Sequence, residues 1–239
     1  MSDGYLVCAT PRTGSTLLCG LLASTGVAGT PESYLRAEDE AAWASRFGLA
    51  ERYEYVDFVR RARDQGSTAN GVFAARVMWG TLDKVVDRLR PSLGAAGHAA
   101  RDLDVLRAAF GDLRFVHLWR EDVLAQAVSW ARAEQTGMWH RPNDVGDAAE
   151  PSFDREQIAA LCATIDRHNG AWHDWFAGNG VEPLEVHYED LNRDPVGEAR
   201  DVLQRLGIDV PAATALEVRD RRLRDEVNDD WVARYRTGA

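Results

Sequence analysis

Short apolar runs alternate with helical patterns along most of this chain, and this alternation constrains the fold more than any other feature. Four runs have the length of buried strands: 5–9, 71–78, 114–119 and 184–188. None alternates cleanly between apolar and polar residues, which is typical of strands covered on both faces. We therefore predict an α/β fold with a mostly parallel central sheet flanked by helices.

Helical patterns separate the predicted strands. Apolar residues recur at helical spacing in four segments: 17–22, 82–89, 123–131 and 158–176. A fifth helix is the best delimited, because Asp194 can cap its start, Pro195 suits its first turn and Gly207 can end it. We predict one domain, residues 1–239, with a helical insertion at about 37–70 between the first two strands.

Composition excludes several classes of protein. The 28 Lys and Arg residues against 38 Asp and Glu give a net charge of −10, which argues against general binding of nucleic acids or anionic membranes. Three scattered cysteines indicate neither a disulfide framework nor a metal site. Because no apolar stretch approaches about 20 residues and no signal peptide is evident, we predict no integral membrane segment and a cytoplasmic location.

The first predicted strand runs into a loop of small residues and then into a helix. Such a loop aims backbone N–H groups and the positive end of the helix dipole at one point. Gly14 permits close approach, Ser15 and Thr16 add hydroxyl groups, and Arg12 adds a guanidinium. An ordinary helix cap is the alternative, but Arg12 within the loop favours binding of a phosphate or sulfate. The Lys of a nucleotide triphosphatase loop is missing.

A second candidate anion site follows the third strand. Arg120 stands where that strand ends, at the edge of the sheet that binds ligands in open α/β folds. Ser129 lies nine residues further on, in the next helix. The alternative is a surface arginine paired with Glu121 or Asp122.

Together these features resemble the sulfotransferases that use 3′-phosphoadenosine-5′-phosphosulfate (PAPS), and most closely the trehalose 2-sulfotransferase family. The matching pieces are spread nearly from end to end: 5–18, 25–29 with Pro31, 71–72 with 78–79, 120–130, 132–133, 135–136 with Trp139, and a tail with Trp231, Arg234 and Tyr235. The resemblance implies a P-loop-like sulfotransferase fold, PAPS as sulfuryl donor, no metal, and a homodimer.

The resemblance also assigns roles to residues. The 5′-phosphosulfate of the donor would be held by Arg12, Thr13, Gly14, Ser15 and Thr16. The 3′-phosphate would be held by Arg120 and Ser129, and Arg222 lies in a C-terminal segment, about 217–239, that closes over the nucleotide. The acceptor would contact Glu32, Ser33, Arg76 and Trp139.

Catalysis would rest on Arg12, which stabilises charge on the leaving phosphate and the sulfuryl oxygens, and on Glu32 as the base. This chain departs from the family at two of these positions. The family has its catalytic Glu two residues after the proline that matches Pro31, where this chain has Ser33, so Glu32 stands one residue early and can equally be an exposed loop carboxylate. Arg76 replaces the usual Lys.

The sequence therefore predicts an enzyme that transfers a sulfuryl group to a hydroxyl of a carbohydrate or glycolipid, with a trehalose-like acceptor compatible with the resemblance. Two alternatives remain at this level. One is a small-molecule kinase of the P-loop type, and the other is a noncatalytic protein that binds PAPS or its product PAP.

Overall fold

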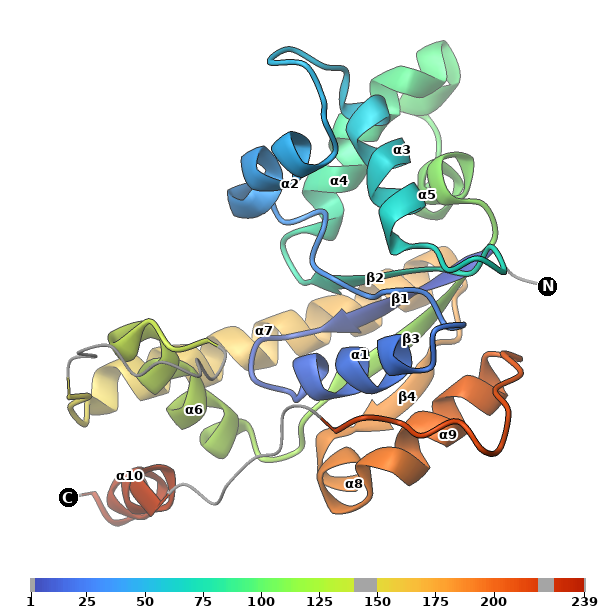
Figure 1. Ribbon diagram of the computed structural model, residues 1–239. Coiled ribbons are helices and arrows are strands. Elements are labelled where there is room, and N and C mark those ends of the chain that lie inside the picture. The colour runs from blue at the N-terminus through green and yellow to red at the C-terminus, as the bar shows by residue number, and fades with distance from the viewer. Residues whose placement is uncertain (1–2, 140–149, 219–225, 239) are drawn as a thin grey trace.

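A parallel sheet of four strands forms the centre of the molecule (Figure 1). The computed structural model describes residues 3–139, 150–218 and 226–238. The strands lie in the order β2-β1-β3-β4. Their bounds are β1 Gly4–Ala9, β2 Phe73–Met78, β3 Leu113–Trp119 and β4 Leu184–His187. All the pairings are parallel, which confirms the predicted α/β class.

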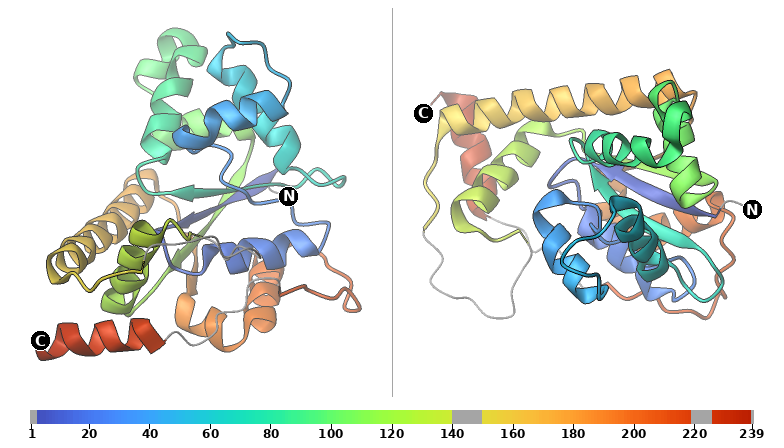
Figure 2. Two further views of the ribbon diagram at one scale, coloured as in Figure 1. Left: turned by 60° about the vertical axis from the view of Figure 1, so that its left-hand side comes forward. Right: turned by 90° about the horizontal axis from the view of Figure 1, so that it is seen from above.

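Helical elements connect and cover the strands. In chain order they are α1 Ser15–Ser24, η1 Ala37–Asp39, α2 Glu40–Arg46, α3 Tyr55–Gly66, α4 Leu82–Leu89, η2 Arg90–His98, α5 Asp102–Phe110, α6 Val123–Thr136, α7 Arg155–Asn179, α8 Tyr188–Arg193, α9 Pro195–Arg205 and α10 Glu226–Thr237. Helices α2–α5 lie on one side of the sheet, and α1, α8 and α9 lie on the other (Figures 1 and 2). The long helix α7 packs Trp172 and Phe176 into the same apolar cluster as α3, α4 and α5.

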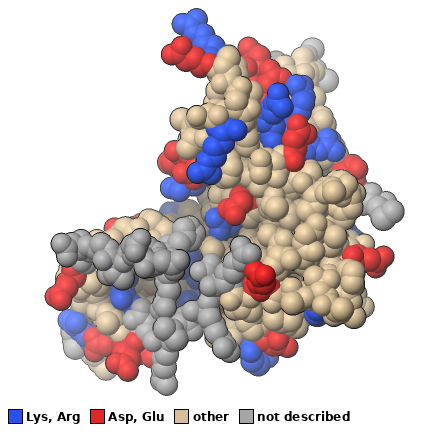
Figure 3. Space-filling model, viewed as in Figure 1, with Lys and Arg blue, Asp and Glu red and all other residues tan. Residues whose placement is uncertain are grey.

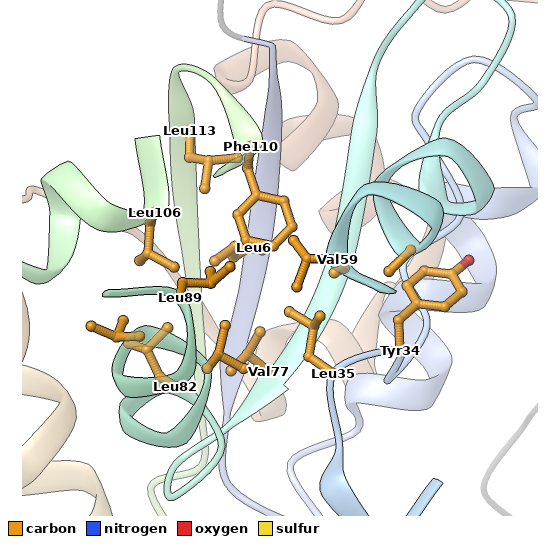
Figure 4. Close-up of a cluster of buried hydrophobic side chains, with 14 of the residues drawn as sticks. Leu6, Tyr34, Leu35, Val59, Val77, Leu82, Leu89, Leu106, Phe110 and Leu113 are labelled. Atoms are coloured by element: carbon orange, nitrogen blue, oxygen red, sulfur yellow. The ribbon is translucent and has the colours of Figure 1, made fainter. Parts of the chain in front are cut away.

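Strand β1 is buried on both faces and divides the core into two layers. Leu6 and Cys8 point into the cluster formed with α3, α4, α5 and α7, part of which Figure 4 shows. Tyr5, Val7 and Ala9 point into the cluster formed with α1 and α9. Successive side chains of a strand alternate between the two faces, so a strand that is apolar at every position must be covered twice.

A third apolar cluster lies away from the sheet, between α6, α7 and α10. Trp231 of α10 is 3% exposed there, beside Val128 and Ile165. Arg132 of α6 donates a hydrogen bond to the buried Asn228 of α10 at 2.6 Å. These contacts fix the described end of the C-terminal segment against the helix that follows β3.

The predicted strands and the five predicted helices are confirmed, with small shifts at their ends. Asp194 caps α9 by accepting a hydrogen bond from the backbone N–H of Gly197 at 2.9 Å. Tyr188 begins α8 instead of ending β4, and α5 has no predicted counterpart. The segment 37–70 holds η1, α2 and α3, and its status as an insertion stays a prediction. No described helix is long and apolar enough to span a membrane.

The close packing of the segment before η1 gives a test of this architecture. Gly29 has φ +72°, and a Cβ there would lie 2.7 Å from Ala74 Cβ and 2.8 Å from its backbone nitrogen. We expect Gly29→Ala to lower the free energy of unfolding by about 3 kcal/mol, measured by urea denaturation, because backbone strain and overpacking add.

Gly26 provides the matched control. It has φ +69° but nothing lies within 4 Å of a Cβ added there. Gly26→Ala should therefore lower the free energy of unfolding by about 1 kcal/mol, through backbone strain alone. Equal losses in the two variants would contradict the close approach of residue 29 to β2.

Candidate active site

The loop between β1 and α1 presents an open helix N-terminus. Gly14 is the N-cap of α1, with φ 81°, and no side chain caps the helix. A Cβ on Gly14 would lie 2.9 Å from the ring of Tyr188, so the position needs glycine for its space as well as its backbone. Uncapped N–H groups at a helix start form a ready site for an anion.

Arg12 stands in this loop in a conformation that L-residues rarely adopt. Its φ is 69°, and it is the one non-glycine residue in the described part of the chain with a positive φ. Its Nε donates to Ser129 Oγ at 3.0 Å, and its Nη1 donates to the carbonyl of Trp139 at 2.8 Å. Arg12 thus links the loop to α6 and to the residues just after it.

Buried polar contacts from α6 and α7 hold the loop from beneath. Gln126, which is fully buried, donates from Nε2 to Thr10 Oγ1 at 2.8 Å and to the carbonyl of Pro11 at 2.7 Å. Trp172 Nε1 donates to the carbonyl of Ala9 at 3.1 Å. Thr13 Oγ1 donates a hydrogen bond to the carbonyl of Thr10 at 2.9 Å. Thr13 would therefore contact a ligand through its backbone.

Sequence reasoning missed Gln126 and Trp172. The sequence does contain a signal for Gln126. It lies between Val123 and Ala127 on the face of α6 that packs inward, where an apolar side chain is expected. A buried amide must find hydrogen-bond partners. Here those partners are the loop itself.

Arg120 occupies the position expected from the sequence, at the end of β3, but it is more buried than a surface arginine. It is 5% exposed, and its guanidinium lies 4.4 Å from the ring centroid of Tyr188. Arg120 is therefore a buried residue and not an exposed surface arginine. Ser129 accepts a hydrogen bond from Arg12, so the structure joins Ser129 to the loop.

A cavity of about 460 Å³ opens beside the loop, within the size range of small-molecule sites. Its described lining includes Pro11, Arg12, Ser15, Thr16, Ser33, Arg76, Trp79, Trp130, Trp139 and His168, together with residues of η1, α3 and α4. The cavity therefore brings together Arg12, Ser15, Thr16, Ser33, Arg76 and Trp139 of the residues predicted from sequence.

Arg76 connects the loop to the segment before η1. Its Nη1 donates to Thr16 Oγ1 and its Nε to Ser33 Oγ, each at 2.9 Å. Both of these partners are neutral hydroxyl groups, so this cation can also face an anion in the cavity. Arginine supplies a planar fork that makes such double contacts where the usual Lys would be a point charge.

Glu32 is exposed and lies outside the described lining of the cavity, while its neighbour Ser33 is part of it. The reason is local backbone geometry. Glu32 forms a parallel bridge with Ala75, and its carbonyl accepts from the backbone N–H of Arg76 at 2.9 Å. In such an extended segment successive side chains point in opposite directions.

Two other groups in the cavity wall can exchange protons. Glu134 accepts a hydrogen bond from Gln157 Nε2 at 3.0 Å. Burial, reinforced by the charge of Arg167, lowers the pKa of His168. Within residues 3–139, 150–218 and 226–238 no group of three or more His, Cys, Asp or Glu could hold a metal ion. Arg222 lies outside the described residues.

Known proteins share the fold of this chain. The sulfotransferase domain of the curacin biosynthetic pathway superimposes with a TM-score of 0.50 at 13% identity, over 87% of this chain and 75% of that domain. This likeness shows a shared fold.

Two curated proteins are similar over almost their whole length. The trehalose 2-sulfotransferase of Mycobacterium tuberculosis is 31% identical, over 98% of this chain and 95% of that protein. The trehalose 2-sulfotransferase of Mycolicibacterium smegmatis is 32% identical, over 100% of this chain and 97% of that protein. The sequence model of the Stf0 sulphotransferase family matches residues 4–238. The chain belongs to the Stf0 sulfotransferase family.

Proposed function

We propose that this enzyme transfers the sulfuryl group of PAPS to a hydroxyl group of a carbohydrate or glycolipid acceptor. The observation that carries the proposal is the uncapped start of α1, with Arg12 held beside it in a left-handed conformation. Non-glycine residues in this conformation cost about 1–3 kcal/mol and persist mainly at functional sites. Trehalose, which the names of the two relatives contain, is the first acceptor to test.

The residues present suit the donor. The N–H groups at the start of α1, with Ser15 and Thr16, would bind the 5′-phosphosulfate, and Arg120 with Ser129 would bind the 3′-phosphate. Arg222 is assigned from the resemblance alone. PAPS supplies an activated sulfuryl group when bound.

Arg12 would act through electrostatics. A fixed guanidinium stabilises negative charge that develops on oxygen atoms during transfer, and it needs no reorganisation at that moment. The hydrogen bonds from Arg12 to Ser129 and to the carbonyl of Trp139 fix its position. This favours an enzyme over the noncatalytic alternative, and membership of a sulfotransferase family removes the support for the kinase alternative.

The acceptor hydroxyl must lose a proton to a base. We propose Glu32 for this role on the resemblance, which requires its carboxylate to turn toward the cavity once the acceptor binds. Catalytic contacts are often completed only in the substrate complex. A homodimer is implied by the resemblance in the same way, and it stays a prediction, as does the cytoplasmic location that the sequence indicates.

The 3′-phosphate site is tested by titration calorimetry with PAP in the absence of magnesium. We expect micromolar binding by the wild type and binding at least about tenfold weaker in Arg120→Ala, since a hydrogen bond to a charged group contributes about 1.5–3 kcal/mol. Arg114→Ala is the control, because Arg114 is an exposed arginine at the other end of β3. No PAP binding by folded wild-type protein would overturn the proposed donor.

The support given by Gln126 is tested with Gln126→Leu. Loss of its hydrogen bonds to Thr10 and Pro11 should let the loop relax, so we expect PAP affinity to fall about fivefold to tenfold. The titration is run well below the unfolding temperature of the variant. Gln204→Leu, at an exposed site on α9, should bind like the wild type. An unchanged affinity in Gln126→Leu would show that the loop holds its shape without this residue.

The base is tested by three glutamine variants with saturating PAPS and trehalose. If Glu32 is the base, Glu32→Gln should lower kcat by about 100-fold or more, because general bases contribute on that scale. Glu134→Gln and His168→Gln should then keep kcat within a few fold. A large loss of kcat confined to Glu134→Gln or to His168→Gln would show that the base is that residue, on α6 or α7 respectively, and not Glu32.

A further inference from the structure

The cavity has a side that the proposed donor residues do not reach. Strand β1 lies between β2 on one side and β3 and β4 on the other. Arg120 and Ser129, the proposed 3′-phosphate residues, follow β3. The wall on the other side comes from elements that flank β2: residues 35–38, the start of α3 at Tyr55, and the cavity-lining residues between Trp79 at the end of β2 and Arg88 of α4. We call this wall the acceptor side.

Two of the three cations on the acceptor side are neutralised by carboxylates of the chain itself. Arg36 contacts Glu38 at 3.2 Å and Asp39 at 3.3 Å. Arg88 donates to Glu40 at 2.9 Å, and this hydrogen bond lowers the pKa of Glu40, which therefore stays ionised near neutral pH. Arg88 also lies 3.5 Å from the ring centroid of Tyr55.

Lys84 is the third cation, and its surroundings are different. It is exposed, and it makes no ion pair or hydrogen bond with any residue of the described chain. Thr81, Lys84, Val85 and Arg88 follow one another at helical spacing and all line the cavity, so this face of α4 points inward. Lys84 is also the one lysine of the 239 residues.

The rest of the acceptor side suits a sugar ring. Trp79 lines it and is held by an edge-on contact with the buried Trp172, with ring centroids 5.0 Å apart. Leu35 and Val85 add apolar surface. Figure 3 shows charged side chains of both signs over the upper helices of this view.

We propose that the acceptor is a carbohydrate that carries an anionic group, a phosphate or a carboxylate, and that Lys84 binds this group. The inference rests on the proposed function and narrows its acceptor. A protein with a net charge of −10 repels anions in general, so an anionic acceptor needs a local cation. The carboxylates beside Arg36 and Arg88 occupy those side chains, whereas the ammonium of Lys84 is available to a ligand.

The proposal is tested by titrating sugars into PAP-saturated protein, so the readout does not depend on turnover. The probes are trehalose, trehalose 6-phosphate, glucose and glucuronate, at constant ionic strength. We expect the wild type to bind at least one anionic sugar about tenfold or more tightly than its neutral counterpart. The phosphate and carboxylate arms distinguish the two forms of the anionic group.

Three variants assign the preference to Lys84. Lys84→Met should abolish the tenfold preference without changing affinity for the neutral sugar, and Lys84→Arg should keep most of it. Arg61→Met, at an exposed site on α3 outside the acceptor side, is the control for net charge. Equal affinity for charged and neutral sugars in the wild type, or a preference that survives in Lys84→Met, would overturn the proposal.

The titration also separates this inference from the proposed function. If PAP binds and trehalose binds as well as its phosphate, the inference fails and the sulfotransferase function stands. If PAP does not bind to folded protein, the proposed function fails, and the inference falls with it.

Discussion

The site depends on a strained loop that buried polar side chains hold in place. Gln126 and Trp172 come from two different helices, yet both donate hydrogen bonds to the backbone or side chains of residues 9–11. Buried hydrogen-bonding groups left without partners would each cost about 1–3 kcal/mol. That penalty is comparable to the strain of a left-handed arginine. The core of the sheet and the geometry of Arg12 are therefore energetically linked.

The order of the strands places the proposed donor residues and the proposed acceptor side on opposite sides of β1. Because β1 is central, its loop faces both the residues after β3 that we propose for the nucleotide and the proposed acceptor side beside β2. Arg12 reaches from the loop to Ser129 of α6, and Arg76 on β2 reaches to Thr16 of α1 and to Ser33. Group transfer requires donor and acceptor to meet at one point, and this arrangement provides that point at the start of α1.

Much of the fold could be predicted from sequence because its signals are local. Apolar runs located the strands, and Asp194 with Gly207 located the ends of one helix within a residue or two. Helix α5 was missed although Leu103, Leu106 and Phe110 recur at helical spacing, so its signal was local as well. The contacts of Gln126 and the burial of Arg120 could not be predicted, since both depend on which segments the fold places beside residues 10 and 188.

The segment at residues 32–33 shows how a small change in sequence can alter chemistry. The bridge between Glu32 and Ala75 fixes this segment as extended chain, in which a shift of one residue exchanges the two faces. Ser33 consequently meets Arg76 in the cavity, and the carboxylate of Glu32 points outward. A hydroxyl at this position holds Arg76 without neutralising it, whereas a carboxylate would form an ion pair. Compared with a carboxylate, Ser33 therefore leaves the cavity more positive, which is the direction that favours the proposed anionic acceptor on the side of Lys84.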